Sequence, residues 1–231
     1  FENQYIVPEG MSYNSWLIAD SQVAILDTAD ARLAEEWKRH LTQALADRQP
    51  DYLVVHHMEP DHASLVAWAM EQYPAMQIVC STQAAKMLPQ FFEGIKTDGR
   101  VRIVKEGDTL CLGQHTLRFI GAPMVHWPEV LMSYEEKSGT LFSADAFGKF
   151  GALQNEPDDW ACEARRYYFN ICGKYGTQVN NVLKKATSPC PQAICPLHGP
   201  VLRGAALQQA VSLYETWSSY EPENEGVLVA Y

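Results

Sequence analysis

Two patterns of hydrophobic residues alternate along this chain, short apolar runs and apolar residues spaced at helical intervals, and they divide it into strands and helices. Short apolar runs bounded by turn residues are typical of strands. Such runs predict strands at residues 4–8, 14–19, 23–27, 52–56, 77–80, 117–121, 130–134, 140–143 and 192–195. Leu33, Trp37, Leu41, Ala44 and Leu45 lie instead on one face of a helix. Further helices are predicted at residues 63–72, 83–91, 159–185 and 204–217.

The order of these elements indicates the fold class. Strands and helices mix towards both ends of the chain, whereas residues 101–143 contain β-rich runs and almost no helical pattern. Strands and helices bury their apolar faces by stacking in layers. This order therefore predicts an α/β fold with a two-sheet core and helices outside.

The C-terminal part of the chain changes character after the last predicted helix. Residues 218–226 are polar and include Pro222 and Gly226, which predicts an interdomain linker. The apolar run at residues 227–231 is expected to begin another domain. The chain starts at Phe1 without an initiator methionine and stops inside this run, so we expect a fragment of a longer protein.

Composition and charge narrow the class of protein. Hydrophobic residues make up 47% and charged residues 20% of the 231 residues, as in ordinary globular proteins. No apolar run reaches the roughly 20 residues that a membrane span needs. The formal charge of −10 lacks the basic face that nucleic acid or an anionic membrane would require, so neither is an expected partner.

The cysteines indicate a reducing environment. None of the six belongs to a CxxC pair, which excludes the usual zinc-ribbon and rubredoxin patterns. We expect them to be buried, reduced thiols of a cytoplasmic protein. They are Cys80, Cys111, Cys162, Cys172, Cys190 and Cys195.

The strongest chemical signal is the sequence His57-Met58-Glu59-Pro60-Asp61-His62, directly after the predicted strand at 52–56. Four of these six side chains are strong metal ligands. Pro60 stiffens the segment and disfavours a helical conformation at Glu59. A loop of this kind can present several ligands from one strand end.

Three single candidates follow far downstream: His126, Asp145 and His198. Each comes after a predicted strand, as the first motif does. Together the seven residues supply four imidazoles and three carboxylates, which is more than one ion of ordinary coordination needs. The set predicts a dinuclear metal site that shares a bridging carboxylate.

The carboxylates also bear on the identity of the metal. Glu59, Asp61 and Asp145 bring three negative charges, which suit iron or manganese, whereas zinc hydrolases use more nitrogen ligands. Zinc also accepts carboxylates, so a dizinc hydrolase that uses a bridging hydroxide is the alternative enzyme. A non-catalytic sensor of NO or O2 is a third possibility that the sequence leaves open.

The ligand pattern resembles the metallo-β-lactamase-fold module of flavodiiron proteins over residues 1–219. Hydrolytic members of that superfamily carry histidine where this chain has Glu59. The resemblance extends to Tyr13-Asn14-Ser15, Ala122-Pro-Met-Val-His-Trp-Pro128, Phe142-Ser-Ala-Asp-Ala-Phe-Gly148, Arg166-Tyr167-Tyr168 and Cys195-Pro-Leu-His-Gly199. It implies a metallo-β-lactamase-like αββα four-layer sandwich, with residues 220–231 as a linker and the first strand of a flavodoxin-like domain.

The resemblance also implies how the seven side chains divide between two irons. The expected ligands are His57, Glu59 and His126 for one iron and Asp61, His62 and His198 for the other, with Asp145 as the bridge. In the family, the histidine at the position of His62 can swing away from the metal.

The activity implied by the resemblance is reduction of O2 to water or of NO to N2O. Electrons would come from FMN on the flavodoxin-like domain, which this chain lacks, supplied in turn by a redox donor such as rubredoxin or a flavin reductase. Family members are typically head-to-tail homodimers in which the flavin of one subunit faces the irons of the other. Electron transport by the isolated module is therefore not expected without that domain.

Other histidines and aromatic residues have more ordinary interpretations. Three histidines outside the ligand set are expected to be structural: His40, His56 and His115. If the strand at 52–56 continues, adjacent side chains point to opposite faces, so only one of His56 and His57 can reach a metal. Trp127, Tyr167 and Tyr168 are expected either to pack in the core or to form an aromatic wall with a phenol that donates a proton.

Overall fold

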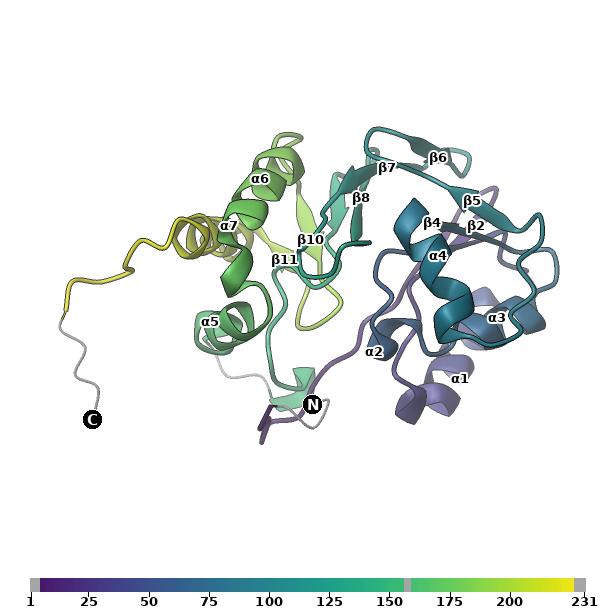
Figure 1. Ribbon diagram of the computed structural model, residues 1–231, viewed down its shortest axis with the longest axis horizontal. Coiled ribbons are helices and arrows are strands. Elements are labelled where there is room, and N and C mark those ends of the chain that lie inside the picture. The colour runs from purple at the N-terminus through teal and green to yellow at the C-terminus, as the bar shows by residue number, and fades with distance from the viewer. Residues whose placement is uncertain (1–4, 156–158, 227–231) are drawn as a thin grey trace.

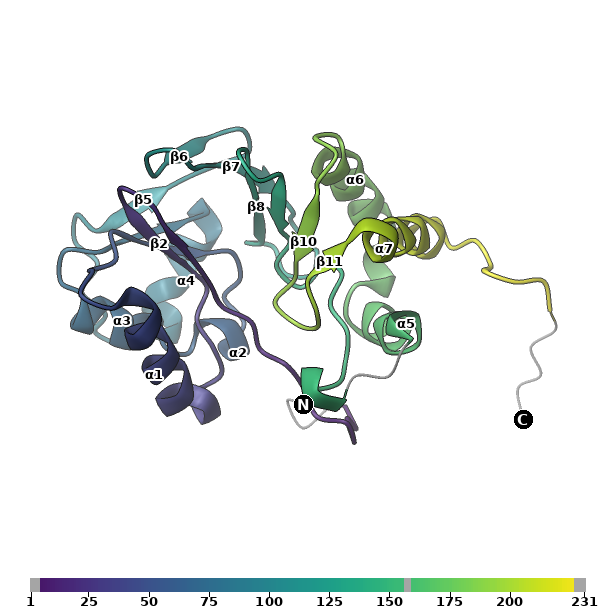
Figure 2. The same cartoon turned by 180° about the vertical axis from the view of Figure 1, so that it is seen from behind.

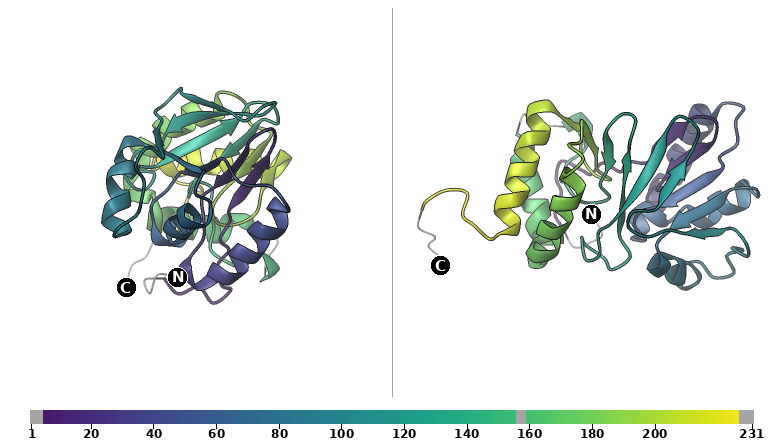
Figure 3. Two further views of the ribbon diagram at one scale, coloured as in Figure 1. Left: turned by 90° about the vertical axis from the view of Figure 1, so that its right-hand side faces the viewer. Right: turned by 90° about the horizontal axis from the view of Figure 1, so that it is seen from above.

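The computed structural model describes residues 5–155 and 159–226. Two mixed sheets lie face to face between two layers of helices (Figure 1, Figure 2). Seen from above, the order across the molecule is helices, sheet, sheet, helices (Figure 3). The predicted αββα four-layer sandwich is therefore confirmed.

The first sheet has the strand order β1-β2-β3-β4-β5. Its strands are β1 (Trp16–Ala19), β2 (Val23–Leu26), β3 (Tyr52–Val55), β4 (Gln77–Cys80) and β5 (Val101–Ile103). β1 and β2 are antiparallel, and the other pairs are parallel. Parallel pairs need crossover connections, which here contain helices on the outer face. They are α1 (Ala34–Leu45), α2 (Pro60–Ala63), α3 (Val66–Gln72) and α4 (Thr82–Phe91), with a 3-10 turn at Ala31–Leu33 before α1.

The second sheet has the strand order β11-β10-β9-β8-β7-β6. Its strands are β6 (Thr109–Cys111), β7 (Thr116–Gly121), β8 (Leu131–Glu135), β9 (Thr140–Phe142), β10 (Ala193–Cys195) and β11 (Leu202–Arg203). β9 and β10 are parallel, and the other neighbours are antiparallel. The helices on this side are α5 (Trp160–Ile171), α6 (Gly176–Thr187) and α7 (Gly204–Ser218), with 3-10 turns at Leu153–Asn155 and Gly173–Tyr175.

The central strands are buried on both faces, which explains their continuous apolar sequences. In β2, Ala24 and Leu26 face the second sheet, whereas Val23 and Ile25 pack under the helices. Phe119 from β7 lies in the same layer between the sheets. This two-sided burial makes each central strand rigid up to its last residue, where the candidate ligands begin.

Three predictions of local structure were incomplete or wrong. Residues 5–8 of the strand predicted at 4–8 form no strand; Gly10 instead donates a backbone hydrogen bond to Val7. The helix predicted at 159–185 is two helices, because the chain breaks around Gly173 and Gly176. A β-carbon at Gly176 would lie 2.6 Å from the carbonyl oxygen of Ser218, so close packing against the end of α7 requires glycine. The two-residue strand β11 was not predicted, and β5 and β6 were expected only as part of the β-rich region at 101–143.

The cysteine prediction was half right. All six cysteines are free thiols, but Cys111, Cys162 and Cys190 are exposed rather than buried. Burial raises the pKa of Cys80 to about 12 and that of Cys195 to about 11. Buried thiols of this kind are unreactive.

The C-terminal segment, predicted as a linker, has few regular features. Residues 219–226 contain no helix or strand, and they extend from the end of α7 (Figure 1). Glu223 accepts hydrogen bonds from Arg165 and Trp217 and ties this segment to the module. The strand predicted at 227–231 lies outside the described residues. Among those described, no helix combines the length and apolar character needed to cross a membrane.

One buried polar chain joins the two sheets directly beside the ligand motif. Asp27, at the end of β2, accepts a hydrogen bond from Nδ1 of His56 at 2.6 Å, and Nε2 of His56 lies 2.8 Å from the hydroxyl of Ser133 in β8. All three side chains are buried. Asp27 also accepts the backbone N–H groups of His56 and, at 3.3 Å, His57. This connection resembles a catalytic triad in geometry, but its burial makes it a structural joint.

Replacement of Asp27 by alanine is expected to destabilise the metal-free protein by about 3–5 kcal/mol, because it leaves buried donors of His56 without their acceptor. Denaturant unfolding of the metal-free chain measures this change. The matched control is Asp98→Ala at an exposed position, where the change should stay within about 0.5 kcal/mol. Equal unfolding free energies for the two variants would contradict the structural role of the joint.

Candidate metal centre

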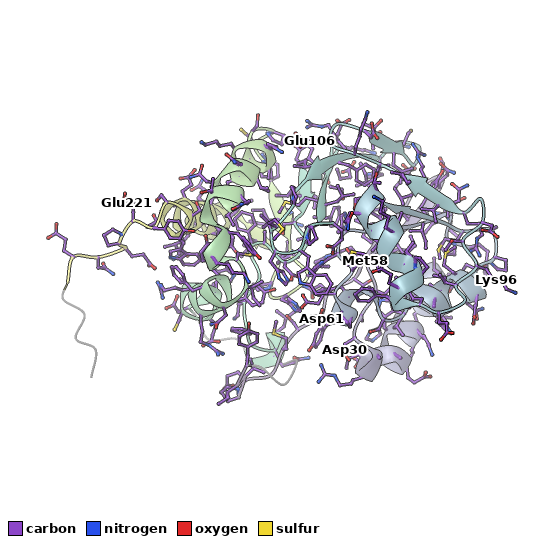
Figure 4. All side chains as sticks on the ribbon, viewed as in Figure 1. Asp30, Met58, Asp61, Lys96, Glu106 and Glu221 are labelled. Atoms are coloured by element: carbon purple, nitrogen blue, oxygen red, sulfur yellow. The ribbon has the colours of Figure 1, made fainter. Side chains whose placement is uncertain are left out.

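The structure brings all seven candidate ligands to one end of the two sheets. His57 and Glu59 follow β3, Asp61 and His62 lie in α2, His126 precedes β8, Asp145 follows β9, and His198 follows β10. Figure 4 labels Asp61, which belongs to α2, near the middle of the molecule. The ligand motif therefore lies between the two halves of the molecule, because strands of both sheets end there.

The ligand atoms fall into two clusters. The outer group is His57, Glu59, His126 and Asp145, and the inner group is Asp61, His62 and His198. Within each group the candidate atoms all lie within 4.8 Å of one another. Nε2 of His57 is 3.2 Å from Nε2 of His126, and Nε2 of His62 is 3.0 Å from Nε2 of His198. The division matches the two predicted ligand sets.

Asp145 faces both groups with different oxygens. Its Oδ2 atom lies 3.0 Å from Nε2 of His126 and 3.6 Å from Nε2 of His57. Its Oδ1 atom lies 3.1 Å from Nε2 of His62 and 3.9 Å from Nε2 of His198. A carboxylate with one oxygen towards each group has the arrangement that a bridging ligand needs.

Local backbone conformation explains how the motif presents its side chains. Glu59 is extended, with φ −59° and ψ 139°, and Pro60 begins α2 at the first helical position. This agrees with the expected effect of proline on the preceding residue. Gly199 has φ +89°, and a β-carbon there would lie 2.7 Å from Cγ of the buried Lys149. Glycine after His198 therefore lets the two loops pass closely.

The electrostatics of the site couple buried carboxylates to imidazoles. Burial opposes the charged form of Glu59, but hydrogen bonds from His126 and His57 outweigh it and lower its pKa to about 2. Burial likewise opposes protonation of His126, yet Asp145 and Glu59 raise its pKa to about 9. The same competition raises the pKa of His57 and lowers that of Asp145. Protons on the imidazoles thus balance the carboxylates, and a cation would replace those protons.

Unpartnered buried atoms test whether the site fits a metal pair. Both carboxylate oxygens of Asp61, Oδ1 of Asp145 and Nδ1 of His62 are buried without a hydrogen-bond partner among the described residues. Nε2 of His62 is within 3.2 Å of Asp61 and Asp145 oxygens, yet forms no hydrogen bond with them. Buried carboxylate oxygens are costly unless a cation or donor compensates them. Two pairs of imidazole nitrogens that converge on these oxygens fit two metal ions well.

Behind the candidate ligands, hydrogen bonds come from Glu129 and Ser12, which the sequence did not single out, and from Asn14, which lies in the Tyr13-Asn14-Ser15 segment of the resemblance. Nδ1 of His57 donates to Glu129 at 2.7 Å, and Nδ1 of His198 donates to the carbonyl of Ser12 at 2.7 Å. Asn14 donates to the carbonyls of Pro196 and Gly199 and holds the loop that carries His198. The available signals were the position of Glu129 three residues after His126 and the Tyr13-Asn14-Ser15 segment.

The remaining candidates also have clear positions. His56 takes part in the joint between the sheets, and His40 is exposed on α1. His115 lies before β7 rather than in it, with Nδ1 3.1 Å from the Glu135 carboxylate. None of these three belongs to either metal group.

The two tyrosines and the tryptophan have different surroundings. The ring of Trp127 makes edge contacts with His57 and His126, with centroids 5.2 and 6.1 Å apart. Tyr167 makes an edge contact with His198 at 5.6 Å, whereas Tyr168 packs among aromatic residues of α5 and α7. Only Trp127 and Tyr167 of these three therefore contact a candidate ligand in the structure.

A small polar cavity of about 280 Å³ opens onto the outer group. Its lining residues are Tyr5, Glu59, His126, Trp127, Asn170, Ile171, Lys174 and Tyr175. Asp61, His62 and His198 do not line it and are buried. A larger cavity of about 450 Å³ lies between α6, β10 and α7 and includes none of the candidate ligands. The site is thus reached from the side of Glu59 and His126.

Comparison with known proteins gives concordant results. Residues 11–199 match the family described as ODP family beta lactamase. The chain is 30% identical to rubredoxin-oxygen oxidoreductase from Megalodesulfovibrio gigas, over 99% of this chain and 58% of that protein. It is 31% identical to nitric oxide reductase from Moorella thermoacetica, over 95% of this chain and 56% of that protein.

A solved structure extends the likeness to three dimensions. The flavodiiron protein from Giardia intestinalis matches with a TM-score of 0.87 and 29% identity, covering 94% of this chain and 54% of that one. The chain spans 38–58% of the length of the first curated relatives that it matches. The likeness thus concerns one module of longer proteins.

Replacement of Asp145 by alanine is expected to weaken binding of both metal ions by more than about 100-fold, because a shared ligand contributes more than an outer-shell partner. Metal content per chain after dialysis against buffer, measured by elemental analysis, tests this. The control variant His40→Ala should keep its metal, since His40 is exposed on α1. Retention of two ions by the Asp145 variant would overturn the bridging assignment.

Proposed function

The chain belongs to the ODP family of beta-lactamase-fold proteins as a flavodiiron-type module, and we propose that it is the diiron site of an O2 or NO reductase. The observation that carries this proposal is the pairing of an outer and an inner ligand group across the two oxygens of Asp145. Relatives named as a rubredoxin-oxygen oxidoreductase and a nitric oxide reductase support the same chemistry. Residues 1–219 would form this module.

The residues assigned to the two irons are those of the two groups. His57, Glu59 and His126 would hold one ion, and Asp61, His62 and His198 the other, with Asp145 between them. When bound, an iron pair supplies two electrons to small diatomic molecules, and FMN on a flavodoxin-like domain would supply more. The linker and strand proposed for residues 220–231 would lead to that domain.

The protein's own side chains prepare the site in three ways. Glu129 and Ser12 orient His57 and His198 through their Nδ1 atoms, so that Nε2 of each ring faces the metal position. Trp127 forms an apolar wall beside the outer group. The cavity at Glu59 and His126 admits a small molecule from outside.

Tyr167 provides a proton donor on the inner side of the site. Its side chain is fully buried, and its hydroxyl has no hydrogen-bond partner among the described residues. Burial and the charges of Asp145, Cys172, Glu59 and Asp61 raise the pKa of Tyr167, so the phenol stays protonated at neutral pH. We assign it the role of donating a hydrogen bond or proton to the reacting molecule.

The name of one relative, rubredoxin-oxygen oxidoreductase, supports a proposal for the electron donor of the whole protein. A rubredoxin is the proposed electron donor, with a flavin reductase as the second candidate, and the proposed assembly is a homodimer that functions in electron transport in the cytoplasm. Glu59 disfavours the dizinc hydrolase, whose ligand sets contain more nitrogen.

The proposed function predicts about two irons per chain when the protein is expressed with iron and purified without oxygen. After chemical reduction, a single exposure to NO should yield about one N2O per iron pair, since two electrons, two protons and two NO give N2O and water. Elemental analysis and gas chromatography measure the two quantities. About two zinc ions without iron, together with no N2O from iron-reconstituted protein, would reject the proposal in favour of the hydrolase.

Replacement of Tyr167 by phenylalanine is expected to slow the reaction of the reduced protein with NO by about 100-fold or more, because a positioned acid contributes that much. Iron content should be unchanged, since the hydroxyl holds no described partner. Stopped-flow absorbance measures the rate. Tyr168→Phe is a matched control, because its hydroxyl is also buried and unpartnered but its ring packs against Tyr214 and Trp217. Equal rates for the two variants would contradict the assignment.

A further inference from the structure

We propose that Glu129 is a positioning residue that makes the two metal positions unequal, so that the outer position fills first and binds its ion more tightly. The outer position is that of His57, Glu59 and His126, and the inner position is that of Asp61, His62 and His198. This inference rests on the proposed function, since it requires two metal ions. It adds an order of loading and names the side chain that sets it.

Glu129 holds the outer group at two points. Its Oε1 atom accepts Nδ1–H of His57 at 2.7 Å and the backbone N–H of Met58 at 2.9 Å. The hydroxyl of Ser81, at the start of α4, donates to the carbonyl of Glu129 at 2.8 Å. One carboxylate thus fixes both the ring of His57 and the loop that carries it, with Nε2 free for the metal.

The location of Glu129 makes its charge effective. Its side chain is fully buried, and Oε2 has no hydrogen-bond partner among the described residues. A buried carboxylate behind an imidazole increases the basicity of that ligand. Because water does not screen this charge, it favours a cation on the far side of the ring.

The inner group has weaker support behind its ligands. His198 donates to a neutral backbone carbonyl, that of Ser12. Nδ1 of His62 is buried without a hydrogen-bond partner among the residues that the structure describes. Among the described residues, a carboxylate thus accepts from Nδ1 of His57, whereas Nδ1 of His198 faces a neutral carbonyl.

The number of carboxylates near each position also favours the outer one, as the hydrogen bonds do. The outer position has Glu59 and the shared Asp145 as ligands and Glu129 behind His57. The inner position has Asp61 and one oxygen of the same Asp145. More negative charge and a better-fixed imidazole both favour the first cation at the outer position. Repulsion between the two cations then weakens binding of the second.

Titration of the metal-free chain with Mn²⁺ tests the order of loading. The free ion is counted by its electron paramagnetic resonance signal at room temperature. Two classes of site with affinities at least about tenfold apart are expected for the unmodified chain. Glu129→Gln keeps a hydrogen-bond acceptor but removes the charge, so it should weaken the tight class by about 10–100-fold and the weak class by less than about threefold.

Three further variants make the result specific. His62→Ala should remove the weak class and leave the tight one. Glu135→Gln, which neutralises a buried carboxylate at the end of β8 that belongs to neither ligand group, should change neither class. Glu129→Asp retains the charge and should restore part of the tight affinity, which also covers the case in which Glu129→Gln fails to fold by circular dichroism.

Several results would overturn the inference. Two classes of equal affinity would do so, as would equal weakening of both classes by Glu129→Gln or loss of the tight class in His62→Ala. In each of these cases the unmodified chain still binds two ions, so the proposed function stands while the inference fails. An unmodified chain that binds no pair of Mn²⁺ ions overturns both.

Discussion

The position of Asp145 is the constraint on which the rest of the site depends. One carboxylate lies between four imidazoles, with one oxygen towards the outer group and the other towards the inner group. Such a residue must be buried, and it must come from a rigid element that ends between the two halves of the molecule. β9 satisfies both demands, because it pairs with β8 and β10 and ends three residues before Asp145. Without this residue the two ligand groups would share no side chain.

The remaining ligands are held by connections that cross from one sheet to the other. The segment from Glu129 to Ser133 contacts the end of β3 three times: Glu129 binds His57 and Met58, Leu131 donates to the carbonyl of His56, and Ser133 meets the ring of His56. These bonds fix the loop after β3 of the first sheet to the segment that leads into β8 of the second sheet. The layered fold thus serves the site by fixing the relative position of two loops, which neither sheet could do alone.

The sequence predicted where the candidate ligands lie but not which residues support them from behind, and the reason is physical. His57, Asp145 and His198 each follow an apolar strand run, so their place at a sheet end could be read locally. Glu129 acts through a contact 72 residues away in the chain, and only its place three residues after His126 distinguishes it from a solvated glutamate. The break between α5 and α6 was missed for a similar reason, because Gly176 is required by the distant carbonyl of Ser218. Local periodicity shows which face of an element is buried, whereas the roles of Glu129 and Gly176 depend on residues that are distant in sequence.

The two groups also differ in their access to solvent, so the site has an open outer side and a closed inner side. Glu59 and His126 line the cavity, whereas Asp61, His62 and His198 are at most 1% exposed. Small molecules therefore approach from the outer side, while the phenol of Tyr167 lies against His198 on the inner side. A proton donor opposite the entrance is shielded from bulk water, which would otherwise compete for its hydrogen bond. Under the proposed function, burial of the inner side would thus shield the hydroxyl of Tyr167 from bulk water.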